Sequence, residues 1–136
     1  VKLAAFLRSE QGLNTQLQEK GSNFSGGQCQ RLALARALLQ DSGVYIFDEA
    51  TSNIDVESEN DILAEIHALA KKKTVVMISH RLANVVAADN IYVLVHGNVT
   101  ESGTHGALLE KQGQYARLWE AQQALEHYGE KKEAAV

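Results

Sequence analysis

The apolar residues of this chain fall into short continuous runs separated by amphipathic segments. The runs at 44–47, 75–79 and 91–95 predict three strands, the first covered on both faces and the second also buried. His96-Gly97-Asn98 then predicts a tight turn into a hairpin that ends at about Glu101. Because these strands alternate with helical segments, the pattern predicts an α/β fold: a mostly parallel sheet, flanking helices, and a C-terminal hairpin with helices.

The segments between the runs carry apolar residues at helical spacing. They predict helices over 2–10, 27–40, 56–70, 82–88, 106–112 and 114–128. The helix over 27–40 is apolar over most of its circumference, so it is expected to be well buried. Gly21 predicts a turn in the polar loop that precedes this helix, and the tail from Gly129 is expected to fray.

Composition narrows the classes of function. The 136 residues, 45% hydrophobic and 22% charged, are typical of a globular domain with one core. A net charge of −4 does not indicate binding to nucleic acid, which usually requires a basic surface. No apolar run approaches the ~20 residues of a membrane helix. The single cysteine, Cys29, allows no internal disulfide, and this fits a reducing compartment. The chain opens within a helical pattern and without methionine, which suggests a segment of a longer protein.

The stretch Ser25-Gly26-Gly27-Gln28 stands at the start of the most apolar predicted helix. Its glycines carry no Cβ, so a ligand can approach the backbone closely. The helix directs its unsatisfied N–H groups and the positive end of its dipole at the turn, which indicates an anion site, for example for a phosphate. Ser25 and Gln28 also fit S-x-x-Q, a capping box that closes a helix start without a ligand. Both interpretations fit these residues.

Acidic and imidazole side chains follow two of the predicted strands. Asp48 and Glu49 end the first strand and His80 ends the second, at the sheet edge where open α/β folds hold ligands. Asp48 could hold a hydrated Mg²⁺, and Glu49 could orient and deprotonate an attacking water. The alternatives are an acid pair before a helix, a packing or capping role for His80, and an ordinary N-cap at Asp55.

The order of these features resembles the ATPase domain of ATP-binding cassette (ABC) transporters over about residues 13–118. The stretch 25–28 resembles the signature motif, 44–48 the Walker B strand, and 52–55 the D-loop. Glu49 matches the catalytic glutamate and His80 the switch histidine. Further similarity to the exporter branch lies in His80-Arg81-Leu82, in Glu101-Ser102-Gly103-Thr104-His105, and in Gly113 with Tyr115 and Leu118.

The resemblance implies that residues 1–136 form the C-terminal portion of one such domain, with a partial P-loop NTPase-like three-layer fold. Residues 1–40 would be the signature part, 41–128 the Walker B, D-loop and switch-histidine part of the catalytic core, and 129–136 a frayed tail. The family's Walker A strand lies between the strands at 75–79 and 91–95. Without it, these two strands are expected to expose unpaired edges, which could close up, exchange with another copy or oligomerise.

The resemblance also implies a role for each matched residue. In the family, two ATPase domains sandwich two ATP molecules. Asp48 would hold Mg²⁺ through water, Glu49 would act on the attacking water, and His80 would contact the γ-phosphate. The signature residues would reach the ATP of the partner domain, and the D-loop aspartate would help link the two sites. The signature motif and the D-loop thus supply the residues expected to bind the nucleotide, which are Ser25, Gly26, Gly27, Gln28 and Asp55.

The implied activity is ATP hydrolysis coupled to export. The expected partners are a second ABC ATPase domain, in a homodimer or heterodimer, and a transmembrane transporter domain at the cytoplasmic face of the cell membrane. No glycine is followed by lysine, so the Walker A pattern is missing, and the chain alone is expected to be inactive. Two alternatives are a soluble ABC-type ATPase acting on nucleic acid or translation, and a non-catalytic truncated module that binds a partner.

Overall fold

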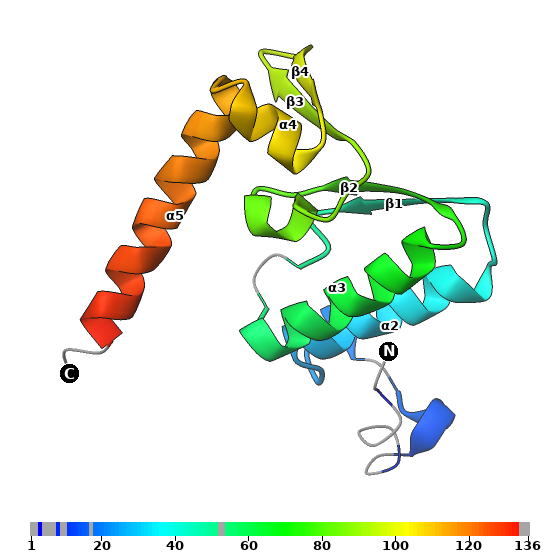
Figure 1. The fold of residues 1–136 in the computed structure, drawn as a ribbon. Helices are drawn as coiled ribbons and strands as arrows, with labels where there is room; N and C mark the ends of the chain where they lie inside the picture. Colours follow the sequence, from blue (N-terminus) through cyan, green and yellow to red (C-terminus); the bar gives the residue numbers. More distant parts are fainter. Residues whose placement is uncertain (1–2, 4–7, 9–10, 17, 52–53, 134–136) are drawn as a thin grey trace. The chain divides into compact units, whose positions relative to one another are not determined.

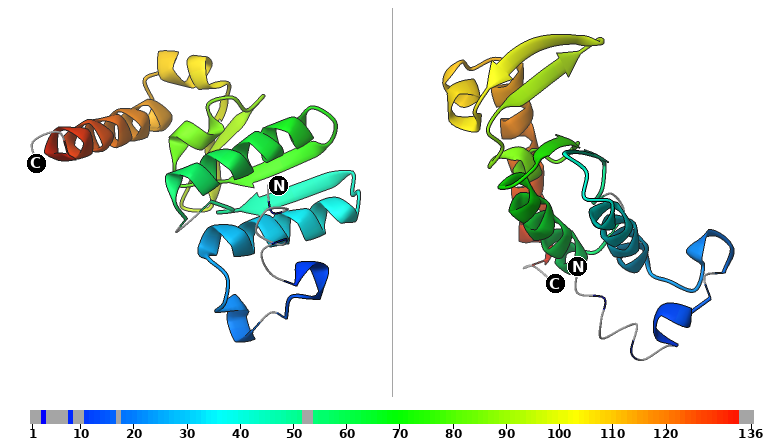
Figure 2. Two further views of the ribbon diagram at one scale, coloured as in Figure 1. Left: turned by 90° about the horizontal axis from the view of Figure 1, so that it is seen from below. Right: turned by 90° about the vertical axis from the view of Figure 1, so that its right-hand side faces the viewer.

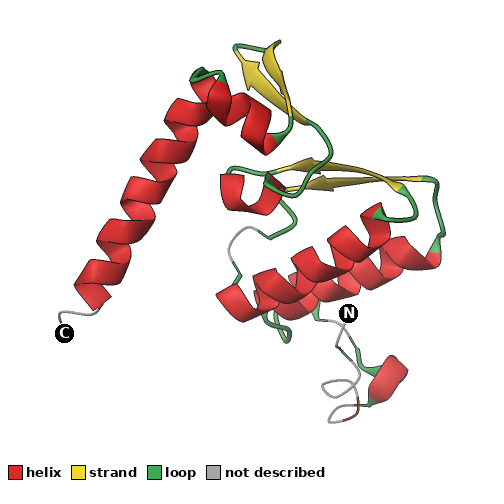
Figure 3. Cartoon of the chain, viewed as in Figure 1, coloured by secondary structure: helices red, strands yellow, loops and turns green. Residues whose placement is uncertain are grey.

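The chain forms two compact units, residues 1–78 and residues 79–136. The structure is a computed structural model that describes residues 3, 8, 11–16, 18–51 and 54–133. The helix predicted over 2–10 and the D-loop residues Ser52 and Asn53 therefore lie wholly or mostly outside the described residues. Figure 3 shows helices and strands in both units, so the predicted α/β class is confirmed.

The described residues of the first unit form two short 3₁₀ turns, Gly12–Asn14 and Glu19–Gly21, followed by the helices and strands of one αβαβ run. Its regular elements are α2 (Gly26–Leu39), β1 (Val44–Asp48), α3 (Val56–Ala70) and β2 (Thr74–Ile78). The two strands pair in parallel, with Val44 opposite Thr74 and Asp48 opposite Ile78. The predicted helix over 56–70 and the parallel pairing are both confirmed.

The core of this unit lies between the sheet and its two helices. Both helices lie on the same side of the β1–β2 sheet (Figures 1 and 2). The side chains at alternate positions of β1 point at these helices, and each helix packs one apolar stripe against them. The buried residues of this core are Leu34, Tyr45, Phe47, Ile62 and Ile66.

The opposite face of the same sheet is exposed, so the prediction of a strand covered on both faces is wrong for the described chain. Ile46 is 69% exposed, and its β2 neighbours Val76 and Ile78 are about half exposed. Of the described elements, both helices of the unit cover only the other face. The sequence showed that both faces are apolar, but not which of them is covered within these residues.

The helix α2 is also less buried than its composition predicts. Leu34 lies in the core, whereas Leu39 in the last turn is 86% exposed. A helix that meets the sheet along one stripe can bury only the residues on that stripe, whatever the remaining faces carry. The helix ends at Leu39, and Asp41, two residues later, takes a left-handed conformation with φ 46°.

In the described part of the second unit, residues 79–133, a hairpin is followed by two helices. Its elements are a 3₁₀ turn (Leu82–Val85), β3 (Ile91–Val95), β4 (Asn98–Gly103), α4 (His105–Glu110) and α5 (Gln114–Glu133). The strands are antiparallel, as predicted, and His96 and Gly97 both have positive φ, which suits a two-residue hairpin turn. Among the described residues, β1 and β2 form one two-stranded sheet and β3 and β4 form another. The expectation of unpaired edges on the strands at 75–79 and 91–95 stays a prediction.

Several boundaries in this unit differ from the predictions. The helix predicted over 82–88 is only a 3₁₀ turn, and β4 continues past Glu101 to Gly103. The helix α5 continues past the predicted end at Tyr128 as far as Glu133, so the described part of the tail is helical. Lys131, Lys132 and Glu133 favour helix, and this outweighs the isolated Gly129.

A carboxylate of the hairpin holds the start of α5. Glu101 on β4 accepts hydrogen bonds from the backbone N–H groups of Gln114 (2.5 Å) and Tyr115 (3.1 Å). These N–H groups have no partner within the helix, and a negative charge there also complements the helix dipole. A Cβ at Gly113 would overlap the Glu101 carboxylate. The exporter-like spacing of Glu101, Gly113 and Tyr115 therefore has a structural cause.

Glu101→Ala should destabilise the second unit by about 1–2 kcal/mol, because two helix-start N–H groups lose their acceptor. Urea unfolding measures this loss. Glu110→Ala, at an exposed position of α4, is the matched control and should cost much less. Equal effects of the two substitutions would contradict the capping role.

Candidate functional site

The turn before α2 is closed by a complete capping box. The Ser25 Oγ accepts a hydrogen bond from the Gln28 backbone N–H at 3.2 Å, and the Gln28 side-chain oxygen accepts one from the Ser25 N–H at 2.8 Å. Ser25 and Gly26 are exposed, so the start of the helix is open to solvent. The capping interpretation is confirmed. The anion interpretation stays a prediction, and the exposed helix start is compatible with it.

The two glycines of this turn have different surroundings. Gly26 is exposed, whereas Gly27 is buried against the first turn of α3. A Cβ at Gly27 would lie 2.4 Å from the Ser58 Oγ and 2.8 Å from the Ser58 Cβ. Gly27 therefore allows close helix packing, and Gly26 is the glycine that remains accessible to a ligand.

A largely buried arginine joins the same two helices. One guanidinium nitrogen of Arg31 on α2 donates to the Ser58 Oγ and to the Asp61 carboxylate on α3, each at 3.1 Å. Sequence analysis missed Arg31 and Ser58, because their contact spans 27 positions and no local pattern signals it. The pair fixes the start of α2 to the start of α3.

Asp55, at the position predicted to belong to the D-loop, is the N-cap of α3. Its carboxylate accepts a hydrogen bond from the Ser58 backbone N–H at 2.8 Å. This bond, together with one from the Ser58 hydroxyl, holds the pKa of Asp55 below its usual range. Because the pKa is lowered by folding, the stabilisation is present above the pKa of the unfolded chain and is lost as the pH falls through the folded value. The N-cap interpretation is confirmed, and Ser58 connects this cap to Gly27.

Asp48 and Glu49 lie at the carboxyl end of β1, as predicted. Both side chains are exposed, so neither carboxylate bears the desolvation cost of a buried charge. The Glu49 backbone N–H donates to the Ile78 carbonyl at 3.0 Å, which continues the strand pairing by one residue. Glu49 also has a left-handed backbone, with φ 48°.

The backbone of Glu49 differs in context from the other left-handed positions. Of the four described non-glycine residues with positive φ, Asp41 and Gln112 follow helix ends and His96 lies in the hairpin turn. Glu49 instead follows a strand directly. Such a conformation costs about 1–3 kcal/mol and is typical of functional sites. This geometry turns the chain out of the sheet at Glu49, whose N–H makes the last bond to β2.

His80 belongs to the second unit and is exposed. It lies in a short segment without regular structure before the 3₁₀ turn at Leu82. The Ser79 Oγ accepts a hydrogen bond from the Arg81 N–H and donates one to the Arg81 carbonyl, both at 3.1 Å. The prediction that His80 follows β2 is confirmed, and its role stays a prediction.

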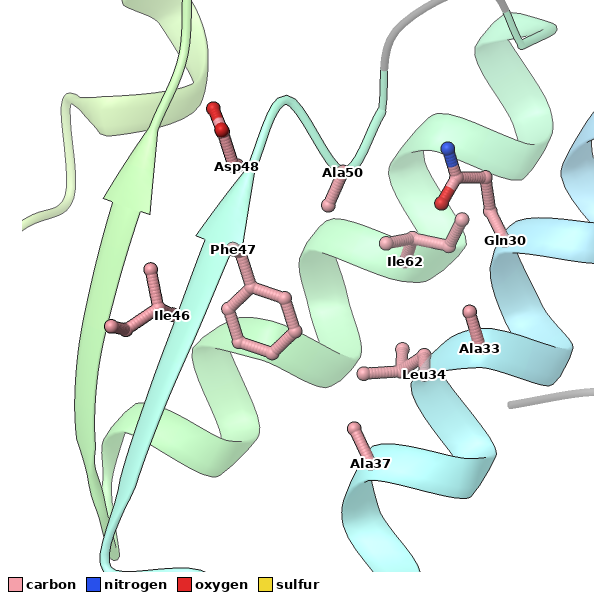
Figure 4. A pocket seen from close by; sticks show the side chains of 9 residues that line it. All are labelled: Gln30, Ala33, Leu34, Ala37, Ile46, Phe47, Asp48, Ala50 and Ile62. Atoms are coloured by element: carbon pink, nitrogen blue, oxygen red, sulfur yellow. The ribbon is translucent and has the colours of Figure 1, made fainter.

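A hollow of about 230 Å³ lies beside β1 in the first unit (Figure 4). Alanines on α2 and after β1 leave this space, and its lining is mostly apolar. The lining residues are Gln30, Ala33, Leu34, Ala37, Ile46, Phe47, Asp48, Ala50 and Ile62. They include one carboxylate and no cation, so the hollow does not suit the phosphates of a nucleotide.

The described residues do not form a metal cage of their own. No group of three or more His, Cys, Asp or Glu side chains among them could hold a metal ion. Asp48 as a single exposed carboxylate still fits magnesium, because Mg²⁺ is usually bound through one or two carboxylates with substrate phosphates and waters. Among the helices that the structure describes, none combines the length and apolarity that crossing a membrane requires.

Comparison with known proteins gives consistent matches. Residues 2–52 match the family model described as "ABC transporter". A Haemophilus influenzae protein named "Uncharacterized ABC transporter ATP-binding protein" is 58% identical over 96% of this chain and 23% of its own length. An "ATP-dependent lipid A-core flippase" of Vibrio vulnificus is 50% identical over 82% of this chain and 19% of its own length. The chain thus spans about a quarter or less of these relatives.

A solved structure matches as well. The structure of a bacterial Atm1-family ABC exporter with ATP bound superimposes with a TM-score of 0.81 and 40% sequence identity. The match covers 88% of this chain and 21% of that one. This likeness confirms the predicted partial P-loop NTPase-like fold.

Gly27→Ala should destabilise the first unit by about 1–3 kcal/mol, because the added methyl group overlaps Ser58. Urea unfolding measures the cost. Gly43→Ala is the matched control, since a Cβ there meets no atom within 4 Å. Adding Ser58→Gly to Gly27→Ala should recover part of the loss. If Gly27→Ala costs no more than Gly43→Ala, the close packing is not the reason for glycine at this position.

Proposed function

Because the chain belongs to the ABC transporter ATP-binding family, we propose that it is the C-terminal part of the ATP-hydrolysing domain of an ABC exporter. The likeness to an exporter structure with ATP bound, over 88% of this chain, carries the proposal. The flippase among the relatives supports a membrane exporter over a soluble ABC-type ATPase acting on nucleic acid or translation. The net charge of −4 supports the same choice.

Asp48 and Glu49 serve the ATP bound by their own domain. Magnesium, when bound with ATP, neutralises charge on the phosphates, and the exposed Asp48 carboxylate would hold it through water. Glu49 orients the attacking water and accepts its proton, which its exposed carboxylate can reach. The left-handed backbone of Glu49 supports this role, because it turns the chain out of the sheet at the reacting position.

His80 contacts the γ-phosphate in this proposal. An imidazole N–H can donate a hydrogen bond to a phosphate oxygen, and the exposed position of His80 after β2 is compatible with that contact. The segment around it is ordered by side-chain bonds rather than by regular structure.

The signature turn serves the ATP of a second domain. Its exposed groups, Ser25 and Gly26, would face the phosphate, and the helix start supplies N–H groups and positive dipole. Two other residues stabilise the turn: Gly27 allows close packing on Ser58, and Gln28 completes the capping box with Ser25. Asp55, on the same packed pair of helix starts, would link the two ATP sites.

The parent protein in this proposal pairs two such ATPase domains, identical or different, and joins them to a transmembrane domain. The domain would lie on the cytoplasmic side of the membrane and couple closure on ATP, and opening after hydrolysis, to transport.

Glu49→Gln in the parent transporter should preserve ATP binding and lower turnover by about 100-fold or more, because the amide cannot accept the proton of water. Nucleotide binding and steady-state phosphate release measure the two effects separately. Glu57→Gln, an exposed acid in the first turn of α3, is the control and should retain activity. Unchanged turnover in Glu49→Gln would remove the proposed base.

Residues 1–136 alone should not bind Mg-ATP with micromolar affinity, because no G-x-x-x-x-G-K-[ST] stretch is present to surround the phosphates. Isothermal titration calorimetry of the purified chain tests this. The parent protein measured under the same conditions provides the positive control. Micromolar binding by the chain would show that the nucleotide needs no further segment, contrary to the proposal.

A further inference from the structure

A glutamine of α5 holds the backbone on both sides of His80. The Gln122 side-chain nitrogen donates to the His80 carbonyl at 2.6 Å, and its side-chain oxygen accepts from the Leu82 N–H at 2.9 Å. A neighbouring parallel strand makes the same pair of bonds, one to a carbonyl and one to the N–H two residues later. The amide of Gln122 therefore replaces a strand neighbour at the point where β2 has ended.

Together with Ser79, this amide satisfies most of the backbone around the histidine. Ser79 binds both the N–H and the carbonyl of Arg81. Gln122 binds the groups on either side of them. The segment lies between β2 and the 3₁₀ turn, so these two side chains stabilise its conformation together with the bond from the Asn84 N–H to the Arg81 carbonyl.

The position of Gln122 is itself fixed by the core of the second unit. Tyr115 lies seven residues earlier on α5, so the two residues share one face of the helix. Tyr115 is only 1% exposed and packs with Ile91, Val93 and Leu108. Glu101 fixes the first turn of the same helix. Burial of Tyr115 thus directs the Gln122 amide at the His80 segment.

We propose that Gln122 is a positioning residue for ATP hydrolysis: it sets the backbone from which His80 reaches the γ-phosphate, and so makes hydrolysis depend on the placement of α5. This inference rests on the proposed function of His80. No local sequence pattern indicates this role, because a glutamine on an amphipathic helix is ordinary and its partners lie 40 and 42 positions away.

The test is single-turnover ATP hydrolysis by the parent transporter, which resolves slow rates, with nucleotide binding measured alongside. Gln122→Leu removes both hydrogen bonds and should slow hydrolysis on the order of 10- to 100-fold, as for an ångström-scale displacement of a reacting group, with ATP affinity unchanged. Gln122→Glu keeps the acceptor for Leu82 but loses the donor to His80, so it should also slow hydrolysis. Gln123→Leu is the matched control, since the Gln123 side chain donates to Glu126 on its own helix, and its rate should equal the wild-type rate.

A double-mutant cycle with His80→Ala separates positioning from mere stability. If Gln122 acts through His80, Gln122→Leu should slow His80→Ala no further. The inference is overturned if the two effects multiply, or if both Gln122 variants hydrolyse within about twofold of wild type while His80→Ala is slow. A wild-type rate in His80→Ala would instead refute the role of His80 in the proposed function.

Discussion

The starts of α2 and α3 approach so closely that no side chain larger than hydrogen fits between them at Gly27. Ser58 fills the opposing position, and Arg31 binds across the same contact to Ser58 and Asp61. The helices meet the sheet as one layer because this contact fixes their separation. It also joins the turn at 25–28 and the N-cap Asp55, the stretches proposed as signature motif and D-loop, through one packed contact. Movement of either motif would have to carry the other with it, or break a buried contact.

The local features of the fold were predictable from sequence, and the reasons are local interactions. The capping box needs only Ser25 and Gln28, and the α3 start needs only Asp55 before an apolar stripe. The hairpin follows from a turn that tolerates positive φ at His96 and Gly97. Order along the chain then placed Asp48, Glu49 and His80 at strand ends, where the structure has them.

The remaining features depend on contacts distant in sequence or on exposure. Hydrophobic pattern indicates that Ile46 is apolar, but not whether a described element covers it, so the strand was predicted to be buried on both faces. A polar residue on a helix gives no indication of which distant group it binds. The contacts of Arg31, Ser58 and Gln122 were therefore not predictable from sequence.

The uncovered face of the β1–β2 sheet has a thermodynamic consequence for whatever segment lies on it. Val44, Ile46, Val76 and Ile78 present branched apolar side chains to solvent across two strands. Burial of such surface carries a large negative heat-capacity change and is driven mainly by entropy near room temperature. A cover over this face would therefore loosen on cooling as well as on strong heating, and its attachment would be tightest at an intermediate temperature.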